Sequence, residues 1–245
     1  ESVKVQSSNK QTHLSIFLKA KSLELEGRKI IHMEVGEPDF LPPQIVKDAL
    51  EEVYDKGFFK YGQAKGIPQF REALAQHVSK NFNVDVKQEN IMVNPGARFG
   101  IFTAINTLLN SGDELIVIEP AWPAYKDCAL YAGVKVRTIN TTLEENWEPS
   151  ISQIEQTINS NTKMIALNYP NNPTGKILSK KLQDEIVNLA IKNDLYILSD
   201  EIYSQYAYAD WKSVLCNNYE KSIVTQSFSK SHAMTGFRIG YTIAH

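Results

Sequence analysis

One lysine near the end of the printed sequence is spaced for covalent chemistry. Lys230 lies three residues after Ser227 and eight residues before Arg238. A lysine amine can form an imine with an aldehyde. A serine hydroxyl and an arginine guanidinium both hydrogen-bond phosphate, the arginine through two parallel bonds. The three residues are therefore suited to hold a small phosphorylated aldehyde, although a lysine between serines is also typical of a solvated loop.

Two upstream motifs have a spacing that would bring them into one site with Lys230. They are Asn-Asn-Pro-Thr-Gly at 171–175 and Asp-Glu-Ile-Tyr at 200–203, so that Asn172, Asp200 and Lys230 are separated by 28 and 30 residues. Each gap matches one strand-helix-strand unit, which would place the three side chains beyond successive parallel strands at one edge of a sheet. Each motif alone is compatible with a turn or a loop acid. Their joint spacing favours a single site.

The elements that must position these residues can be read from hydrophobic periodicity. Apolar runs rich in β-branched residues alternate with helical patterns, which predicts a parallel sheet with right-handed connections and helices on both faces. Strands are expected at 91–94, 114–119, 135–139, 163–168, 195–199, 222–226 and 238–244. Helices are expected at 14–26, 43–57, 67–82, 98–110, 122–132, 150–158 and 179–193, the last with Ser179 as its N-cap.

The motifs together resemble those of the pyridoxal-phosphate (PLP)-dependent aminotransferases of fold type I, the class I and II aspartate aminotransferase family. Four more motifs follow in the family's order, at 35–40 (Val-Gly-Glu-Pro-Asp-Phe), 61–66 (Tyr-Gly-Gln-Ala-Lys-Gly), 95–98 (Pro-Gly-Ala-Arg) and 120–125 (Pro-Ala-Trp-Pro-Ala-Tyr). The resemblance implies an α/β fold with a doubly wound, mostly parallel seven-stranded sheet.

The same resemblance implies a domain organisation. Residues 46–245 would form the PLP-binding large domain, and residues 1–45 an N-terminal arm with part of a small domain. Members of the family continue into a C-terminal domain, which is expected to be absent here. The arginine that clamps the substrate carboxylate would lie in that domain, beyond residue 245. One alternative for the chain as it stands is an incomplete fragment that binds cofactor poorly and has no turnover.

The resemblance assigns three catalytic residues. Lys230 would carry the cofactor as a Schiff base and shuttle protons, because removing the α-proton of an amino acid requires an electron sink. Asp200 would keep the ring nitrogen protonated through a nearby-charge effect of about one to three pK units. Tyr203 and Asn172 would hydrogen-bond the 3-oxygen of the ring, and Trp122 would stack on its face. The alternative for Trp122 is a purely structural role as a core aromatic residue.

The phosphate of PLP would be held by residues from two distant parts of the chain. Gly96, Ala97 and Arg98 open a predicted helix, whose first amides and dipole favour an anion. The helix start alone is a weak signal. The resemblance adds Ser227 and Arg238 as phosphate ligands.

Contacts to substrate and to a second subunit are also implied by the resemblance. Gly36, Trp122 and Asn172 match positions that contact the amino-acid substrate. Tyr61 matches a tyrosine that reaches the phosphate of the other subunit, which implies a homodimer with shared active sites. An exposed tyrosine before a glycine turn is the alternative reading of Tyr61.

The expected activity is transfer of an amino group from an amino acid to a 2-oxo acid in two half-reactions, with ping-pong kinetics. The Trp122-Pro123 pair is common in aspartate-type members, which favours aspartate as donor and 2-oxoglutarate as acceptor. Alternatives on the same fold are an aromatic-amino-acid or alanine aminotransferase and a carbon-sulfur β-lyase. A non-catalytic PLP-binding sensor domain is the alternative from another class.

Composition and charge limit the partners, metals and cellular location that can be expected. The formal net charge of −2 at pH 7 gives no electrostatic reason to expect nucleic acid or an anionic membrane as a partner. No apolar run approaches the ~20 residues of a membrane span. Two cysteines are too few for a disulfide framework, and their spacing and that of the histidines suit no metal site. These features predict a cytoplasmic protein without a metal.

Overall fold

The computed structural model describes residues 13–245, which divide between Leu41 and Pro42 into two compact units. The first unit contains helix α2 (His13–Leu25), as the periodicity predicts. The second unit contains all seven strands and the other helices. The assignment of residues 1–45 to an arm and part of a small domain stays a prediction.

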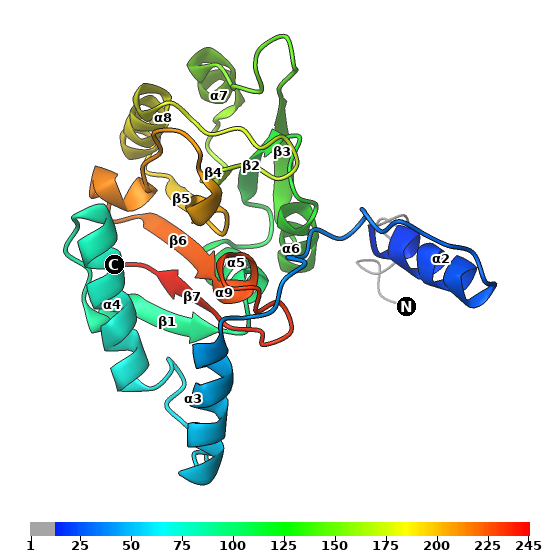
Figure 1. The fold of residues 1–245 in the computed structure, drawn as a ribbon. Helices are drawn as coiled ribbons and strands as arrows, with labels where there is room; N and C mark the ends of the chain where they lie inside the picture. The colour runs from blue at the N-terminus through cyan, green and yellow to red at the C-terminus, as the bar shows by residue number, and fades with distance from the viewer. Residues whose placement is uncertain (1–12) are drawn as a thin grey trace. The chain divides into compact units, whose positions relative to one another are not determined.

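A seven-stranded sheet forms the centre of the second unit (Figure 1), with the order β1-β7-β6-β5-β4-β2-β3. Six strands run in one direction, and β7 is antiparallel to both of its neighbours, β1 and β6. The mostly parallel seven-stranded sheet is thus confirmed. The strands are β1 (Ile91–Asn94), β2 (Glu114–Glu119), β3 (Lys135–Asn140), β4 (Thr162–Asn168), β5 (Tyr196–Asp200), β6 (Ser222–Ser227) and β7 (Gly240–Ile243).

Strand β7 differs from its prediction in direction and in length. The link from β6 to β7 is too short for the long helix of a parallel crossover, so β7 returns antiparallel beside β6. Arg238 has a φ of 56°, in the left-handed region that strands do not use, and the strand therefore begins at Gly240 rather than at Arg238.

Helices cover both faces of the sheet, and alternation along the strands explains why. Leu115 and Val117 pack under α5 (Ala97–Leu108) and α6 (Ala124–Ala132). Their neighbours Ile116 and Ile118 belong to the opposite core, with α4 (Pro68–Phe82), α7 (Ile151–Thr157) and α8 (Lys180–Lys192). Strands buried on both faces are typical of parallel sheets between helical layers. The doubly wound architecture is confirmed (Figure 1).

The predicted helices are all present, and their ends follow local chemistry. Ser179 caps α8, because its hydroxyl accepts a hydrogen bond from the Leu182 amide at 3.2 Å. Short elements were not predicted, since a single turn has no periodicity to detect. They are α9 (Phe228–Ser231) and the 3-10 turns η1 (Gln88–Asn90), η2 (Ser204–Tyr206) and η3 (Val214–Asn217).

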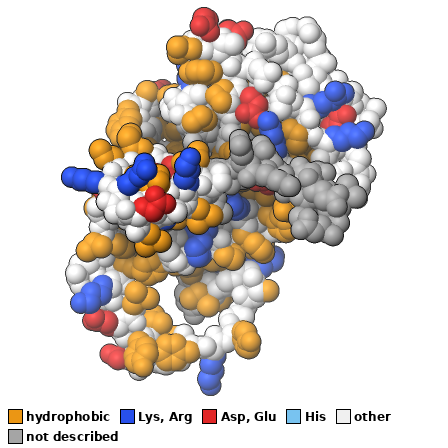
Figure 2. Space-filling view, turned by 90° about the vertical axis from the view of Figure 1, so that its right-hand side faces the viewer, with side chains coloured by type: hydrophobic (Ala, Val, Ile, Leu, Met, Phe, Trp, Pro, Cys, Tyr) orange, Lys and Arg blue, Asp and Glu red, His pale blue; other side chains and the backbone are white. Residues whose placement is uncertain are grey.

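Helix α3 (Gln44–Asp55) is amphipathic but buries none of its residues. Ile45 and Tyr54 are each 72% exposed, and Phe58 and Phe59 in the following loop are about as exposed. Figure 2 shows the resulting gathering of apolar side chains at the lower end of the view, where α3 lies in Figure 1. An exposed apolar face of this kind is typical of an interaction surface. Among residues 13–245, every helix falls short of the length and apolar character that crossing a membrane requires.

Candidate active site

Most of the predicted site residues lie at one edge of the sheet, because the parallel strands end there. The loops after β1, β2, β4, β5 and β6 all leave this edge, and β7 begins at it. The register aligns Asn94 of β1 and Ser227 of β6 with Gly240 of β7, and Asn168 of β4 with Asp200 of β5. Residues from distant parts of the chain are thereby brought to the carboxyl ends of neighbouring strands, where ligands of such sheets bind.

Asp200 is a buried carboxylate at the centre of this edge. Its side chain is only 2% exposed, and Oδ2 accepts a hydrogen bond from the Tyr125 hydroxyl at 2.7 Å. Oδ1 accepts longer bonds from the Ile202 amide (3.3 Å) and the Thr225 hydroxyl (3.4 Å). Burial raises the pKa of Asp200 to about 6, although all three hydrogen bonds act to lower it. A dry carboxylate of this kind favours a cationic partner.

Asn172 and Tyr203 lie together beside it. Burial raises the pKa of Tyr203, and the neighbouring Asn172 side chain acts in the opposite direction. Asn168 links the two loops, because its amide nitrogen donates to the Asp200 carbonyl at 3.1 Å while its amide oxygen accepts from the Asn172 backbone at 3.0 Å. The predicted juxtaposition of Asn172 with the end of β5 therefore has a physical basis in Asn168.

Trp122 is half-buried just before α6, and its two ring neighbours were not predicted. Its ring meets the Tyr125 ring edge to face, with centroids 5.9 Å apart and planes at 87°. The Arg98 guanidinium lies 4.6 Å from the centre of the indole, in a cation–π contact. The Arg98 side chain thus packs on Trp122, whereas its backbone belongs to the first turn of α5.

The first turn of α5 and Arg238 form one corner of the site. No side chain caps α5 at Gly96, so the first amides of this helix, at the positive end of its dipole, can bind an anion. Arg238 donates to the Thr235 carbonyl at 2.8 Å and to the Pro95 carbonyl at 3.4 Å, which places its guanidinium against this turn. The approach is so close that a Cβ at Gly96 would lie 2.3 Å from Arg238 Nη2.

Lys230 is carried by the short helix α9, directly after β6. Ser227 caps this helix, since its Oγ accepts from the Ser229 amide at 3.0 Å. That Oγ also lies within hydrogen-bond distance of Ser229 Oγ (2.8 Å) and of the Ile239 carbonyl (2.9 Å). The Tyr206 hydroxyl donates to the Lys230 carbonyl at 2.8 Å and so joins α9 to η2. Ser227 therefore shapes the turn that presents Lys230.

Two predicted residues belong to other segments of the chain. Tyr61 lies in the loop between α3 and α4, and its side chain is fully exposed. Gly36 belongs to the segment before Leu41 and stays a predicted substrate contact. Within residues 13–245, no three histidine, cysteine or acidic side chains come together in a group that could hold a metal ion.

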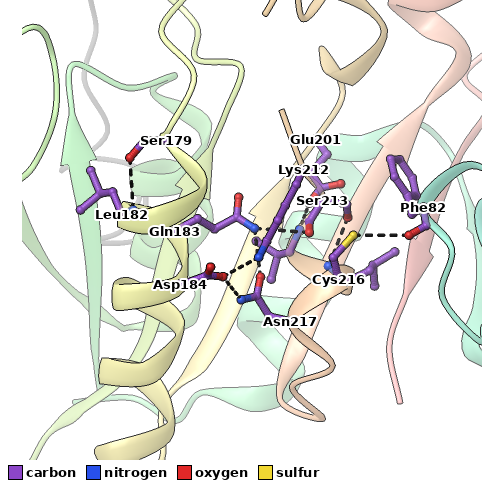
Figure 3. Close-up of polar contacts among 12 residues, drawn as sticks. Phe82, Ser179, Leu182, Gln183, Asp184, Glu201, Lys212, Ser213, Cys216 and Asn217 are labelled. Carbon is purple, nitrogen blue, oxygen red and sulfur yellow. Dashed lines mark hydrogen bonds and ion pairs between the residues drawn. The ribbon is translucent and has the colours of Figure 1, made fainter. Parts of the chain in front are cut away.

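Glu201 is a second buried acid that the sequence did not single out. It is 1% exposed, and its Oε1 accepts from the Ser199 hydroxyl (3.0 Å) and from the Val214 amide (2.9 Å). Oε2 has no hydrogen-bond partner, and burial raises the pKa of Glu201 to about 7. The 3-10 turn η3 beside Glu201 is itself connected to α8, because the Gln183 side chain donates a hydrogen bond to the Ser213 carbonyl at 3.3 Å (Figure 3).

The titration of Glu201 predicts a pH-dependent stability. A glutamate in an unfolded chain titrates near pH 4.3, so between about pH 4 and pH 7 the folded protein binds more protons. The free energy of unfolding should therefore fall as the pH rises through this range. Glu201→Gln should remove roughly 3 kcal/mol of that fall, as measured by urea unfolding at pH 4.5 and pH 8.

The exposed Glu220→Gln is the matched control and should retain the pH dependence of the natural protein. If Glu201→Gln also retains it, another group is responsible for the titration.

Tyr125 is the other residue that the sequence did not single out. Tyr125 is the last residue of the motif at 120–125, in which the sequence predicts a role for Trp122 alone. A buried tyrosine requires a partner for its hydroxyl, but the sequence does not say that a carboxylate 75 residues later supplies it. The signal was the position of Tyr125 three residues after Trp122 within the helix predicted at 122–132, because residues at this spacing lie on the same side of a helix.

Comparisons with known proteins agree with this geometry. The family model described as aminotransferase class I and II matches residues 28–245. The aspartate aminotransferase of Thermotoga maritima is 35% identical over 92% of this chain and 61% of its own length. That of Pyrococcus horikoshii is 37% identical over 94% of this chain and 58% of its own. The solved aspartate aminotransferase of Thermus thermophilus with maleate matches all of this chain and 64% of its own, with a TM-score of 0.96 and 33% identity. The chain thus spans about 60% of the length of the curated relatives it matches.

Proposed function

Because this chain belongs to the class I and II aminotransferase family, we propose that it forms the cofactor-binding part of a PLP-dependent aminotransferase. The whole protein would move an amino group between an amino acid and a 2-oxo acid. The observation that carries the proposal is the buried Asp200 carboxylate at the sheet edge, on the strand next to the one that leads into Lys230.

The chemistry of the residues present fits PLP. The order of the strands separates two kinds of group, with anion-binding groups around β1, β7 and β6 and ring-binding groups beyond β5, β4 and β2. The α5 amides and Arg238 suit the phosphate, and Asp200 suits a protonated pyridine nitrogen. When bound, PLP supplies the electron sink that allows an amino acid to lose its α-proton.

Each side chain then has a defined task. Lys230 would bind the cofactor covalently and move the proton at the substrate α-carbon. Asp200 would hold a proton on the ring nitrogen, and Asn172 and Tyr203 would donate to the 3-oxygen. Trp122 would stack on the ring. The amides of Gly96, Ala97 and Arg98 and the side chains of Ser227 and Arg238 would bind the phosphate.

The tight contact between Gly96 and Arg238 gives a test of the phosphate corner. Gly96→Ala should raise the Kd for PLP at least about tenfold, because the new methyl group displaces a guanidinium that donates charge-assisted bonds. Fluorescence titration with PLP measures the change.

Gly112→Ala is the matched control. Gly112 also has a positive φ (96°), but a Cβ there would meet nothing within 4 Å. It should therefore lower stability without changing the Kd for PLP. Equal affinities of the Gly96→Ala variant and the natural protein would contradict the assignment of this corner.

For the substrates, we propose aspartate as donor and 2-oxoglutarate as acceptor, with ping-pong kinetics. The names of the two relatives and of the solved structure support aspartate as the donor. The experiment is a panel of aspartate, alanine, aromatic amino acids and cysteine conjugates, with and without 2-oxoglutarate. Oxaloacetate formed only when 2-oxoglutarate is present is the expected result. Release of pyruvate and ammonia without an acceptor would instead indicate a β-lyase. Binding of PLP without turnover of any donor would indicate a sensor domain.

We also propose a cytoplasmic homodimer in which Tyr61 contributes to the phosphate site of the partner. Its full exposure leaves its hydroxyl available, and the apolar face of α3 nearby in the sequence offers surface to bury. Analytical ultracentrifugation would measure the association state, and a monomer at micromolar concentration would exclude this arrangement.

A further inference from the structure

The Tyr125 hydroxyl makes the shortest hydrogen bond to Asp200. The distance from Tyr125 Oη to Asp200 Oδ2 is 2.7 Å, whereas the other two donors lie 3.3 and 3.4 Å from Oδ1. Tyr125 is 1% exposed and Asp200 2% exposed, so water does not screen the contact. A hydrogen bond to a charged acceptor in a dry environment is among the stronger ones in proteins.

The phenol can act only as a donor in this position. Burial, and then the neighbouring charge of Asp200, raise the pKa of Tyr125 well above its ordinary value, so the hydroxyl keeps its proton. The other titratable groups that act on Tyr125 are Tyr203 and Cys128, and burial raises the pKa of each. Both are therefore neutral near pH 7, and Asp200 is the charged group that Tyr125 faces.

The Tyr125 ring is fixed from two sides. Its backbone belongs to the first turn of α6, and Trp122 packs against it edge to face. Arg98 in turn lies over Trp122. The hydroxyl is thus directed at Asp200 by a series of contacts that begins on α5 and ends on β5.

We propose that Tyr125 is a positioning residue that keeps the Asp200 carboxylate ionised and thereby holds the shared proton on the pyridine nitrogen of bound PLP. This inference rests on the proposed function. The carboxylate and the ring nitrogen compete for one proton. A donor to the carboxylate lowers its proton affinity, so the proton stays on nitrogen. No bond other than N–H or O–H changes.

The test has one measurement without cofactor and one with it. In the protein without PLP, carbon-13 NMR of labelled aspartate follows the Asp200 carboxyl. Its pKa, about 6 in the natural protein, should rise by about one to two units in Tyr125→Phe. With nitrogen-15-labelled PLP bound, the ring-nitrogen signal of Tyr125→Phe should move toward the unprotonated position.

Tyr219→Phe is the matched control. Its hydroxyl also makes a 2.7 Å bond, but to the Leu195 carbonyl at the opposite end of β5. It should leave both signals unchanged. Incorporation of 3-fluorotyrosine at position 125 strengthens the donor and should lower the Asp200 pKa, which guards against a Tyr125→Phe variant that folds poorly.

The outcomes separate the two proposals. If the natural protein gives no bound PLP signal, the proposed function fails, while the carboxyl titration still decides whether Tyr125 controls Asp200. If PLP binds and neither signal differs between Tyr125→Phe and Tyr219→Phe, the positioning role of Tyr125 is overturned.

Discussion

Replacing Lys230 with alanine should lower amino-transfer turnover by about 10⁴-fold, because in the proposed function this one side chain would both bind PLP covalently and move the proton. The absorption band of covalently bound PLP should disappear as well. Stopped-flow absorbance after addition of aspartate, together with a coupled oxaloacetate assay, measures both effects in the full-length protein.

The control for Lys230→Ala is a substitution that keeps the positive charge but removes the amine that forms the imine. Lys230→Arg retains a cation on α9 but cannot form the same link, so it should be as inactive as Lys230→Ala. Normal turnover in either variant would refute the assignment of Lys230.

Asp200→Asn should reduce turnover by up to about 10³-fold, since in the proposed function the carboxylate would raise the pKa of the ring nitrogen by about one to three units. The shape of the side chain and an acceptor for Tyr125 are retained. Steady-state kinetics at saturating substrate should show the loss in kcat rather than in KM.

The same substitution should stabilise the protein without cofactor. Burial raises the pKa of Asp200 to about 6, above the value of about 3.9 in an unfolded chain. Keeping the acid ionised above pH 6 therefore costs roughly 3 kcal/mol, which Asp200→Asn removes. Urea unfolding at pH 8 measures this gain.

Glu201→Gln is the control for both effects of Asp200→Asn, because it removes the adjacent buried charge. It should share the gain in stability and keep turnover within a few-fold of the natural protein. If the two variants lose turnover equally, the effect belongs to the end of β5 as a whole and not to Asp200.

The sequence predicted the sheet well because most of its strands are buried on both faces. The run at 115–118 (Leu-Ile-Val-Ile) is apolar and mostly β-branched, and a glutamate on each side marks its ends. The gaps between Asn172, Asp200 and Lys230 then located the sheet edge, since the carboxyl ends of β4, β5 and β6 are adjacent. Local patterns were sufficient because each of these relations lies within one strand-helix-strand unit.

The remaining features depend on contacts between distant residues. The bond from Tyr125 to Asp200 joins positions 75 residues apart. The contact of Arg98 with Trp122 depends on how α5 and α6 pack. Glu201 resembled a solvated loop acid, and only the fold of η3 over it shows that it is buried. No periodicity encodes such pairings, because each is fixed by tertiary packing.

Strand β1 pairs with β7 alone, although about 150 residues of chain separate the two. During synthesis, β1 and the start of α5 therefore leave the ribosome long before the strand that attaches them to the sheet. Loop closure over such a distance is slow compared with local folding. The corner where Arg238 meets Gly96 should consequently be the last part of the site to assemble, and hydrogen exchange during refolding should protect the β4–β5 amides before those of β1.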